Sequence, residues 1–247
     1  MGVSRASLYY LAKRPAKDWA LKIEIEGMLR EHPSYGSRRL GQALGMGRER
    51  ARRVMRLYGI HPYRRRGKRY RKRKVKRAYP NLLMEVTPSY PNHVWVTDFT
   101  ELIFHGARVY LSTILDLVTR RLVGVHVAVR KGAALSVATL GNALLREPRP
   151  VILHSDNGSE YASQVFTGML AAYGITVSRS APGCPWENGY QESFYDKFKV
   201  DFGDPNRFKN IGELAEAVYR MAWEYNHTRI HSALKMPPAA FAEQLAA

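Results

Sequence analysis

The chain has 247 residues, of which 45% are hydrophobic and 11% aromatic, enough to bury the core of one large domain or of a catalytic domain with a smaller partner. No apolar run reaches the roughly 18 residues that span a bilayer, and the first residues lack the apolar centre of a signal peptide. The single cysteine, Cys184, excludes an internal disulfide framework and a cysteine-rich zinc site. We therefore expect a cytoplasmic protein that makes no membrane contact.

The net formal charge of +18 is concentrated in the first third of the chain. Residues 1–80 hold 24 Lys and Arg against 5 Asp and Glu, whereas residues 81–247 hold 15 against 16. This asymmetry is typical of a polyanion-binding module joined to a nearly neutral domain with its own core.

The first 60 residues are predicted to form a small all-helical domain. Residues 18–31 have apolar side chains at helical spacing, with Asp18 as the expected N-cap. Residues 35–45 and 47–59 follow as two short helices joined by a glycine-containing turn, which is the pattern of a helix-turn-helix. A solvated basic helix in an ordinary bundle is the alternative, because such patterns also occur in proteins that do not bind DNA.

The second helix of this pair is rich in arginine. We expect Val54, Met55 and Leu57 to pack inward, which leaves the polar positions to Arg48, Arg50, Arg52, Arg53 and Arg56. The two helices supply the first group of predicted DNA contacts, namely Arg38, Arg39, Arg48, Arg52 and Arg53.

Residues 61–77 hold 11 Lys and Arg in 17 positions and no acid. Such a run cannot bury itself and is typical of a solvated linker whose cations contact phosphate. We predict a basic linker at 61–90 between a helix-turn-helix domain at 1–60 and a catalytic domain at 91–247. The DNA contacts predicted in the linker are Arg64, Arg65, Arg66, Lys68, Arg69, Arg71, Lys72 and Arg73.

From about residue 92 the pattern changes to that of an α/β domain. Three successive strands are expected to form a meander, and the alternating helices and strands that follow are expected to add parallel strands to the same sheet. The strands are predicted at 93–102, 109–119, 122–129, 151–156 and 175–180, and the helices at 133–146, 163–173 and 211–226, with one more that bears Glu192.

Three carboxylates stand out by their positions. Asp98 lies inside an apolar strand, where a carboxylate is unfavourable unless it is paired or binds a metal. Asp156 follows a buried strand, at the end where open α/β sheets place ligands. Glu192 lies early in a helix, and Lys199, seven residues on, returns to the same face. Each acid also has an ordinary explanation. Asp98 could be a paired edge-strand acid, Asp156 a turn-forming aspartate before Asn-Gly, and Glu192 a helix-face acid.

Brought together, three carboxylates repel one another unless divalent cations lie between them. Mg²⁺ prefers oxygen ligands and completes its shell with water and substrate phosphate. Two such ions about 4 Å apart stabilise both the attacking and the leaving oxygen of a phosphoryl displacement. The carboxylates and the basic first third together favour metal-dependent phosphoryl transfer on a polyanion.

The segments "WVTDFTEL", "HSDNGSEY" and "ENGYQESFYDKFK" together resemble the DDE integrase core of bacterial IS3-type (OrfB-like) transposases and their retroviral integrase relatives. The 35 residues between Asp156 and Glu192 match the interval of that group. The C-terminal "YNHTRIHSALKMPPAAF" is similar to the segment that closes this core. Upstream, "HPSYGSRRLGQAL" and "RVMRLYGI" are similar to the helix-turn-helix that precedes it, so the resemblance covers nearly the whole chain.

This resemblance implies an RNase H-like fold, a mixed five-stranded sheet with flanking helices, preceded by a small all-α helix-turn-helix domain. It implies that Asp98, Asp156 and Glu192 are catalytic and bind two Mg²⁺ ions, with Mn²⁺ as a substitute. Lys199 is expected to contact the phosphate backbone, and Asn188 and His154 to support the ligands or position DNA. In the C-terminal segment, DNA contact and packing are both open for Tyr225, Asn226, Arg229 and His231, and Arg229 is the predicted DNA contact among them.

One departure from the family pattern concerns the third ligand. Relatives often have Asp where Glu187 stands, which makes Glu187 a rival, and Asp196, one helical turn after Glu192, is a weaker one. The 35-residue interval and the offset to Lys199 favour Glu192.

The implied reaction is Mg²⁺-dependent cleavage at a transposon end, followed by attack of the freed 3′-OH on a phosphodiester without a covalent protein–DNA intermediate. A nuclease that cleaves without joining and a non-catalytic DNA binder are the alternatives. The implied partners are double-stranded DNA at transposon ends and target, further copies of the chain, and an upstream helix-turn-helix product. The implied location is the bacterial cytoplasm, at the nucleoid.

Overall fold

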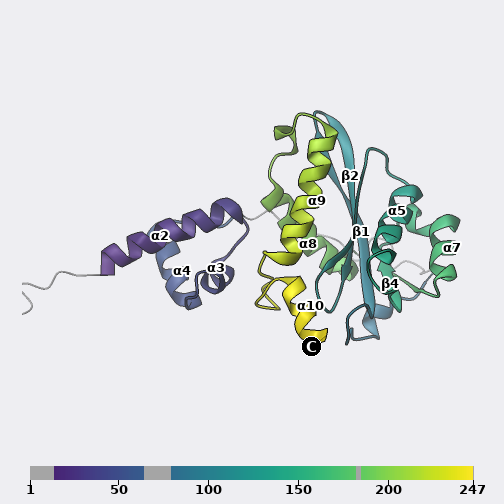
Figure 1. Ribbon diagram of the computed structural model, residues 1–247, viewed down its shortest axis with the longest axis horizontal. Helices are drawn as coiled ribbons and strands as arrows, with labels where there is room; N and C mark the ends of the chain where they lie inside the picture. Colours follow the sequence, from purple (N-terminus) through teal and green to yellow (C-terminus); the bar gives the residue numbers. More distant parts are fainter. Residues whose placement is uncertain (1–13, 64–78, 182–184, 247) are drawn as a thin grey trace, which may run out of the picture. The chain divides into compact units, whose positions relative to one another are not determined.

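The computed structural model describes residues 14–63, 79–181 and 185–246 (Figure 1). The chain divides into two compact units, Met1–Arg64 and Arg65–Ala247. Within the described ranges, no helix combines the length and the apolar character needed to cross a bilayer.

The described part of the N-terminal unit, residues 14–63, contains three helices: α2 (Arg14–Glu31), α3 (Ser37–Ala43) and α4 (Arg48–Leu57). The predicted helix pair therefore forms, and Gly45 adopts a positive φ of 61° in the turn between its members. Gly41 allows the turn to approach α3, because a Cβ at this position would lie 2.9 Å from the backbone oxygen of Met46. Two short helices joined by a tight glycine-containing turn are thus present, as the helix-turn-helix prediction requires.

Two details of this unit differ from the predictions. Helix α2 includes Arg14, so Asp18 lies inside the helix rather than at its N-cap. Its buried carboxylate accepts a 2.7 Å hydrogen bond from Nη1 of Arg53 and fastens α2 to α4. Leu57, expected to pack inward, is 59% exposed, because Ala51, Val54 and Met55 form the buried face of α4.

The second unit is built on a mixed five-stranded sheet in the order β3-β2-β1-β4-β5. Its strands are β1 (Val94–Phe104), β2 (Ala107–Asp116), β3 (Leu122–Ala128), β4 (Ile152–Ser155) and β5 (Thr176–Arg179). The first three form the predicted antiparallel meander, and β4 and β5 extend it in parallel from β1. The expected fold class is confirmed.

Helices cover both faces of the sheet (Figure 1). One face carries α8 (Gly189–Phe202) and α9 (Ile211–His227), and the other carries α5 (Ala133–Leu144), α6 (Ser159–Ala162) and α7 (Gln164–Ala172). Helix α10 (Pro238–Ala246) packs on α9. Three short 3-10 helices complete the described part of the unit: η1 (Leu82–Met84), η2 (Pro185–Asn188) and η3 (Pro205–Arg207).

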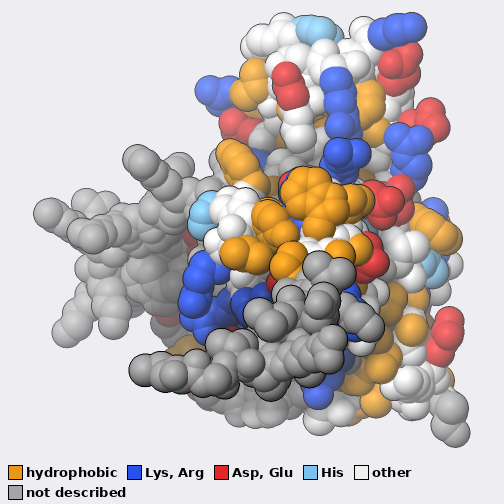
Figure 2. Space-filling view, turned by 90° about the vertical axis from the view of Figure 1, so that its left-hand side faces the viewer, with side chains coloured by type: hydrophobic (Ala, Val, Ile, Leu, Met, Phe, Trp, Pro, Cys, Tyr) orange, Lys and Arg blue, Asp and Glu red, His pale blue; other side chains and the backbone are white. Residues whose placement is uncertain are grey.

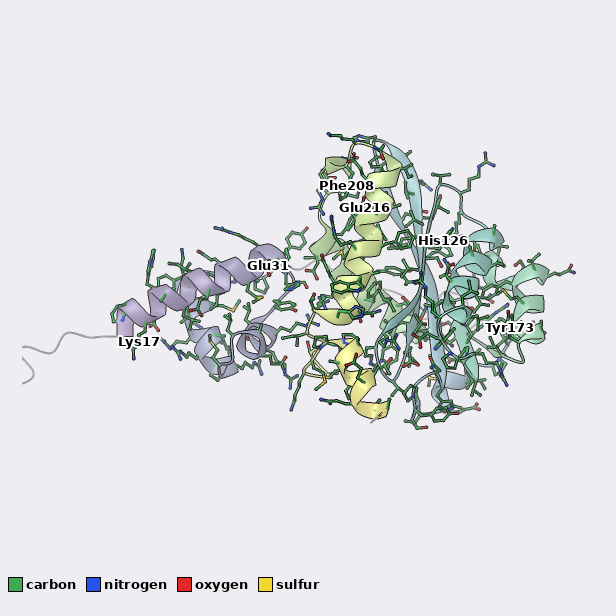
Figure 3. The ribbon with its side chains drawn as sticks, viewed as in Figure 1. Lys17, Glu31, His126, Tyr173, Phe208 and Glu216 are labelled. Carbon is green, nitrogen blue, oxygen red and sulfur yellow. The ribbon has the colours of Figure 1, made fainter. Side chains whose placement is uncertain are left out.

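Two cores result from the alternation of side chains along the strands. In β1, Val94 and Val96 pack with α8 and α9, whereas Trp95 packs with α5 and α7. Side chains fill the space between the sheet and the helices on both of its sides (Figure 3). Asp98 continues the even-numbered series and therefore belongs to the face that α8 covers.

The segment before β1 is part of the second unit. The N–H of Arg179 donates to the oxygen of Pro80 at 3.0 Å, and the N–H of Leu82 donates to Oγ of Ser178 at 2.9 Å. These bonds add residues 80–82 to the free edge of β5. The predicted linker, 61–90, thus extends too far toward the C-terminus, because composition does not reveal backbone pairing to a distant strand.

Two residues of the C-terminal motif, Asn226 and Arg229, make packing contacts with the rest of the unit. The amide of Asn226 donates to the oxygen of Leu122 and accepts from its N–H, both at 2.9 Å, and so satisfies the edge of β3. Nε of Arg229 lies 3.0 Å from Oδ2 of Asp201, with both side chains buried. The prediction that Arg229 contacts DNA is wrong in this geometry, since its guanidinium is enclosed with a carboxylate.

Asp201→Asn should lower the free energy of unfolding of the second unit by roughly 3 kcal/mol or more, because it removes the carboxylate charge beside the buried Arg229 guanidinium. Chemical denaturation at fixed pH measures the change. The matched control is Glu101→Gln, which breaks the exposed 3.8 Å pair with Arg108 and should cost less than about 1 kcal/mol. Equal effects of the two substitutions would contradict a structural role for the buried pair.

Candidate active site

Strand register places two of the predicted carboxylates side by side. In the parallel ladder between β1 and β4, Val96 is opposite His154. Asp98 comes two residues after Val96, and Asp156 comes two residues after His154, just past the end of β4. Neighbouring strands lie about 4.8 Å apart. The ladder of β4 ends at Ser155, so Asp156 stands at the carboxyl end of its strand, as predicted.

Helix α8 brings Glu192 to the same face through three side chains of one helical stripe. They donate to three successive carbonyls of β1: the amide of Asn188 to Thr97 at 3.3 Å, that of Gln191 to Val96 at 2.7 Å, and the hydroxyl of Tyr195 to Asp98 at 2.6 Å. Thr113 of β2 adds a 2.8 Å bond from its hydroxyl to that of Tyr195. The orientation of α8 is therefore fixed against the strand that carries Asp98.

The electrostatics of the site show that its carboxylates are close together. Burial raises the pKa of Asp98 to about 7, and the negative charges of Asp156 and Glu192 also raise it, while the Phe99 N–H and the Lys131 ammonium lower it. Burial also raises the pKa of Asp156. Without a cation, the site thus resists full ionisation at neutral pH.

Each of the three carboxylates keeps oxygen atoms available. Oδ1 of Asp98 accepts from the N–H of Phe99 at 2.8 Å, and Oδ1 of Asp156 accepts from the N–H of Gly158 at 2.9 Å. In the described ranges the second oxygen of each, and both oxygens of Glu192, have no hydrogen-bond partner. Among those residues, no three His, Cys, Asp or Glu side chains are arranged as a preformed metal site. Mg²⁺ is commonly bound by one or two carboxylates together with water and substrate phosphate, so its binding does not require a preformed site of three protein ligands.

The rival ligand Glu187 is occupied in a different network. Its Oε2 accepts from the amide of Asn81 at 2.9 Å and from the N–H of Ala181 at 2.8 Å. These bonds fasten η2 to the segment before β1. The second rival, Asp196, has an interaction partner of its own. Of these three acidic side chains, Glu192 is the one whose negative charge raises the pKa of Asp98 and whose oxygens accept no hydrogen bond from a described residue.

His154 and Asn188 support the site from inside the protein. His154 is fully buried, with Nδ1 2.8 Å from Oγ of Ser178 and Nε2 3.0 Å from Oγ of Ser180. Burial lowers the pKa of His154 to about 4, so the ring is neutral. Asn188 is 4% exposed, and its Oδ1 is buried with no partner among the described residues. A DNA-contact role does not fit either side chain, whereas a supporting role does.

The remaining predicted DNA contacts lie in different surroundings. Arg38, Arg48 and Arg52 are at least partly exposed, Arg39 stacks on Tyr35 at 5.7 Å, and Arg53 is paired with Asp18, as described above. Lys199 is partly exposed on α8, in its last turn. The linker contacts, from Arg64 to Arg73, lie outside the described residues.

Five further residues of the site were not predicted: Gln191, Tyr195 and Thr113, which hold the carboxylate-bearing elements together, and Lys131 and Glu160, whose charges act on Asp156. A signal for the first two exists: Asn188, Gln191 and Tyr195 recur at helical spacing among the phenylalanines of α8. Lys131 had no such signal, since it stands in a loop between β3 and α5.

Asp98→Asn should stabilise the metal-free protein at pH 8 and have little effect at pH 4. The folded pKa of about 7 exceeds the ordinary value of 3.8, so the folded state holds a proton that the unfolded state has released. Stability is therefore lost as pH rises from about 4 to about 7, at roughly 1.4 kcal/mol per pKa unit. Unfolding in EDTA at both pH values, for wild type and Asp98→Asn, measures the difference. A gain for Asp98→Asn that is equal at both pH values would refute the shift.

Comparisons with known proteins place the chain in a family. Two models described as "Integrase core domain" match residues 88–185 and 173–238. A 31 kDa protein of the insertion element IS600 of Shigella sonnei is 33% identical, over 98% of this chain and 96% of its own length. The transposase InsK of the insertion sequence element IS150 of Escherichia coli, described as putative, is 30% identical over 94% of this chain and 87% of its own.

A solved structure agrees in fold. The chain matches the cryo-EM structure of a simian T-cell lymphotropic virus intasome in complex with the PP2A regulatory subunit B56 gamma, with a TM-score of 0.53 and 19% identity, over 84% of this chain and 70% of that one.

The transposase InsF of IS3A from Escherichia coli shares 33% identity over 58% of this chain and 50% of its own length. The chain therefore belongs to the IS3-type insertion-sequence transposases, which carry a DDE integrase core.

Proposed function

We propose that Asp98, Asp156 and Glu192 form the active site at which this transposase cleaves transposon DNA ends and transfers the 3′-OH strand. The observation that carries the proposal is the parallel register of β1 and β4, which sets two ionisable aspartates next to each other in a partly buried position. Glu192 adds its charge from α8. A purely structural sheet gains nothing from such repulsion.

The residues fit two Mg²⁺ ions, or Mn²⁺ in their place, in donor chemistry. All donors are carboxylate oxygens, and each side chain keeps at least one oxygen that no described protein group occupies. Asp98, Asp156 and Glu192 would hold these ions, which would activate the attacking oxygen and offset charge on the scissile phosphate. Burial, and then the negative charges of Asp156 and Glu192, raise the pKa of Asp98, and a divalent cation bound there would favour its ionised form.

The protein's own groups do the positioning. The Phe99 and Gly158 N–H groups each hold one oxygen of an aspartate, which leaves the other available to a ligand. Gln191 and Tyr195 bind carbonyls of β1 and so hold α8, the helix that carries Glu192, against the strand that carries Asp98. Preorganisation of this kind lowers the cost of reaching the transition state.

DNA binding is assigned to three surfaces. Arg48 and Arg52 on α4 are exposed where a recognition helix presents its side chains, and Arg38 lies on the helix before it. The basic run that begins at Arg64 supplies sequence-independent phosphate contacts. Lys199, on the helix of Glu192, is proposed to contact the backbone near the scissile strand. Lys and Arg side chains lie between hydrophobic and acidic ones on the surface drawn in Figure 2.

A nuclease that cleaves without joining is the second candidate, because the same two-metal site would serve both reactions. A non-catalytic binder is less consistent with a site that keeps repelling carboxylates partly buried. Since transposition joins two DNA ends, we propose that the chain works as a homo-oligomer on DNA in the bacterial cytoplasm, and an upstream helix-turn-helix product is a further partner.

Glu192→Gln should reduce strand joining by about 100-fold or more, because it removes a ligand charge while it preserves the shape of the side chain. The substrate is a labelled duplex with the terminal repeat that flanks the coding sequence, incubated with Mg²⁺. Glu187→Gln is the matched control: its amide oxygen still accepts from Asn81 and Ala181, so joining should stay within a few-fold of wild type. The reverse pattern would assign the third ligand to Glu187, and cleavage without joining by the wild type would favour the nuclease.

Neutral substitution of the eight predicted linker cations should weaken binding to terminal-repeat and scrambled duplexes alike. The slope of log affinity against log salt should flatten by about 0.9 for each phosphate that the protein no longer neutralises. Arg52→Gln on α4 should instead lower the ratio of terminal-repeat to scrambled affinity, because base contacts carry specificity. Fluorescence anisotropy at several salt concentrations measures both effects. A linker variant that changed only the ratio would contradict this division of roles.

A further inference from the structure

Lys131 lies between the elements that carry the two catalytic aspartates. It stands in the loop between β3 and α5, with Nζ 3.3 Å from Oε1 of Glu160 and 4.3 Å from the centre of the Phe99 ring. Phe99 directly follows Asp98 in β1, and Glu160 is in α6, which begins three residues after Asp156. The ammonium is therefore near both aspartates, and its positive charge acts on each of them.

Glu160 and Asp156 border the same narrow space. A Cβ built on Gly158 would lie 2.9 Å from Oδ1 of Asp156 and 2.9 Å from Oε2 of Glu160. Glu160 is 8% exposed, so its charge needs a counter-charge, which Lys131 provides. The pair also positions the lysine, because the Phe99 ring and the Glu160 carboxylate contact the ammonium together.

The ammonium nevertheless stays accessible. The Lys131 side chain is 41% exposed, whereas that of Glu160 is 9% exposed. An ammonium has three donors, and the Glu160 bond uses one of them. The positive charge acts on both Asp98 and Asp156, whose pKa values it lowers. A phosphate oxygen brought to these aspartates would meet this cation as well.

We propose that Lys131 binds a non-bridging phosphate oxygen of the DNA strand held at the carboxylate site, with Glu160 and Phe99 positioning its ammonium. The proposal rests on the proposed function, since it requires the strand to lie at Asp98 and Asp156. It adds a phosphodiester-binding residue from the β3–α5 loop to those on α4, α8 and the basic linker. The competing explanation is that Lys131 only balances the buried charge of Glu160.

A double-substitution experiment separates the two explanations. Lys131→Met keeps the aliphatic stem and removes the charge, and Glu160→Gln removes the charge that Lys131 would otherwise balance. Strand joining of the terminal-repeat duplex with Mg²⁺ is measured for wild type, both single variants and the double variant of the full chain. Thermal unfolding of each variant reports the effect on folding.

If Lys131 binds phosphate, Lys131→Met should lower joining about tenfold, and by the same factor in the Glu160→Gln background, because a charge-assisted bond to DNA is removed in both. The slope of log affinity against log salt should fall by about 0.9. Lys131→Arg should recover most of the activity. Lys209→Met, which removes an exposed lysine in the loop before α9, should match wild type in joining.

The proposal is overturned if Lys131→Met joins strands like wild type, or if its defect disappears in the Glu160→Gln background, since the lysine would then only balance Glu160. Asp156→Asn tests the proposed function separately. Should Asp156→Asn join strands at the wild-type rate, the active-site assignment itself fails. A defect in Asp156→Asn with no defect in Lys131→Met rejects the lysine alone.

Discussion

The structure of the catalytic unit depends on one constraint: Asp98 and Asp156 must stay adjacent although their charges repel each other. Backbone hydrogen bonds between β1 and β4 impose the register that makes them neighbours, with Val96 opposite His154. The cost is visible in the pKa of Asp98, which burial and neighbouring charge raise to about 7. The unit folds despite this unfavourable site because burial of the two apolar cores contributes more to the free energy of unfolding than the site costs.

Much of the surrounding structure holds this arrangement in place. His154, neutral and fully buried, ties β4 to Ser178 and Ser180 at the end of β5. Glu187 binds the segment before β1, so the helix that carries Glu192 starts from a fixed point. Gln191 then sets the helix against β1 by a bond to Val96. These polar groups are largely buried, so each bond is strong and a misplaced helix would leave several groups unsatisfied.

The sequence alone predicted the order of strands and the mixed sheet, which the structure confirms, and it named three candidate ligands, which remain a prediction. It did so because the alternation of apolar residues in segments such as 93–102 reports burial directly. It failed where the outcome depends on distant pairing. The buried role of Arg229 requires knowing that Asp201 lies beside it, and the docking of Pro80 requires the free edge of β5. Lys131 stands in a loop, and no periodicity marks a loop residue as part of a site.

The central claim is that Asp98, Asp156 and Glu192 bind divalent cations at one site. Anomalous diffraction from crystals of the full chain soaked in Mn²⁺ tests it most directly, because the scattering identifies the ion independently of the surrounding water. The account predicts density in direct coordination with Asp98 and Asp156, with Glu192 as the third protein ligand when DNA is bound. Density coordinated by Glu187 in place of Glu192, or Mn²⁺ bound only away from both aspartates, would contradict it.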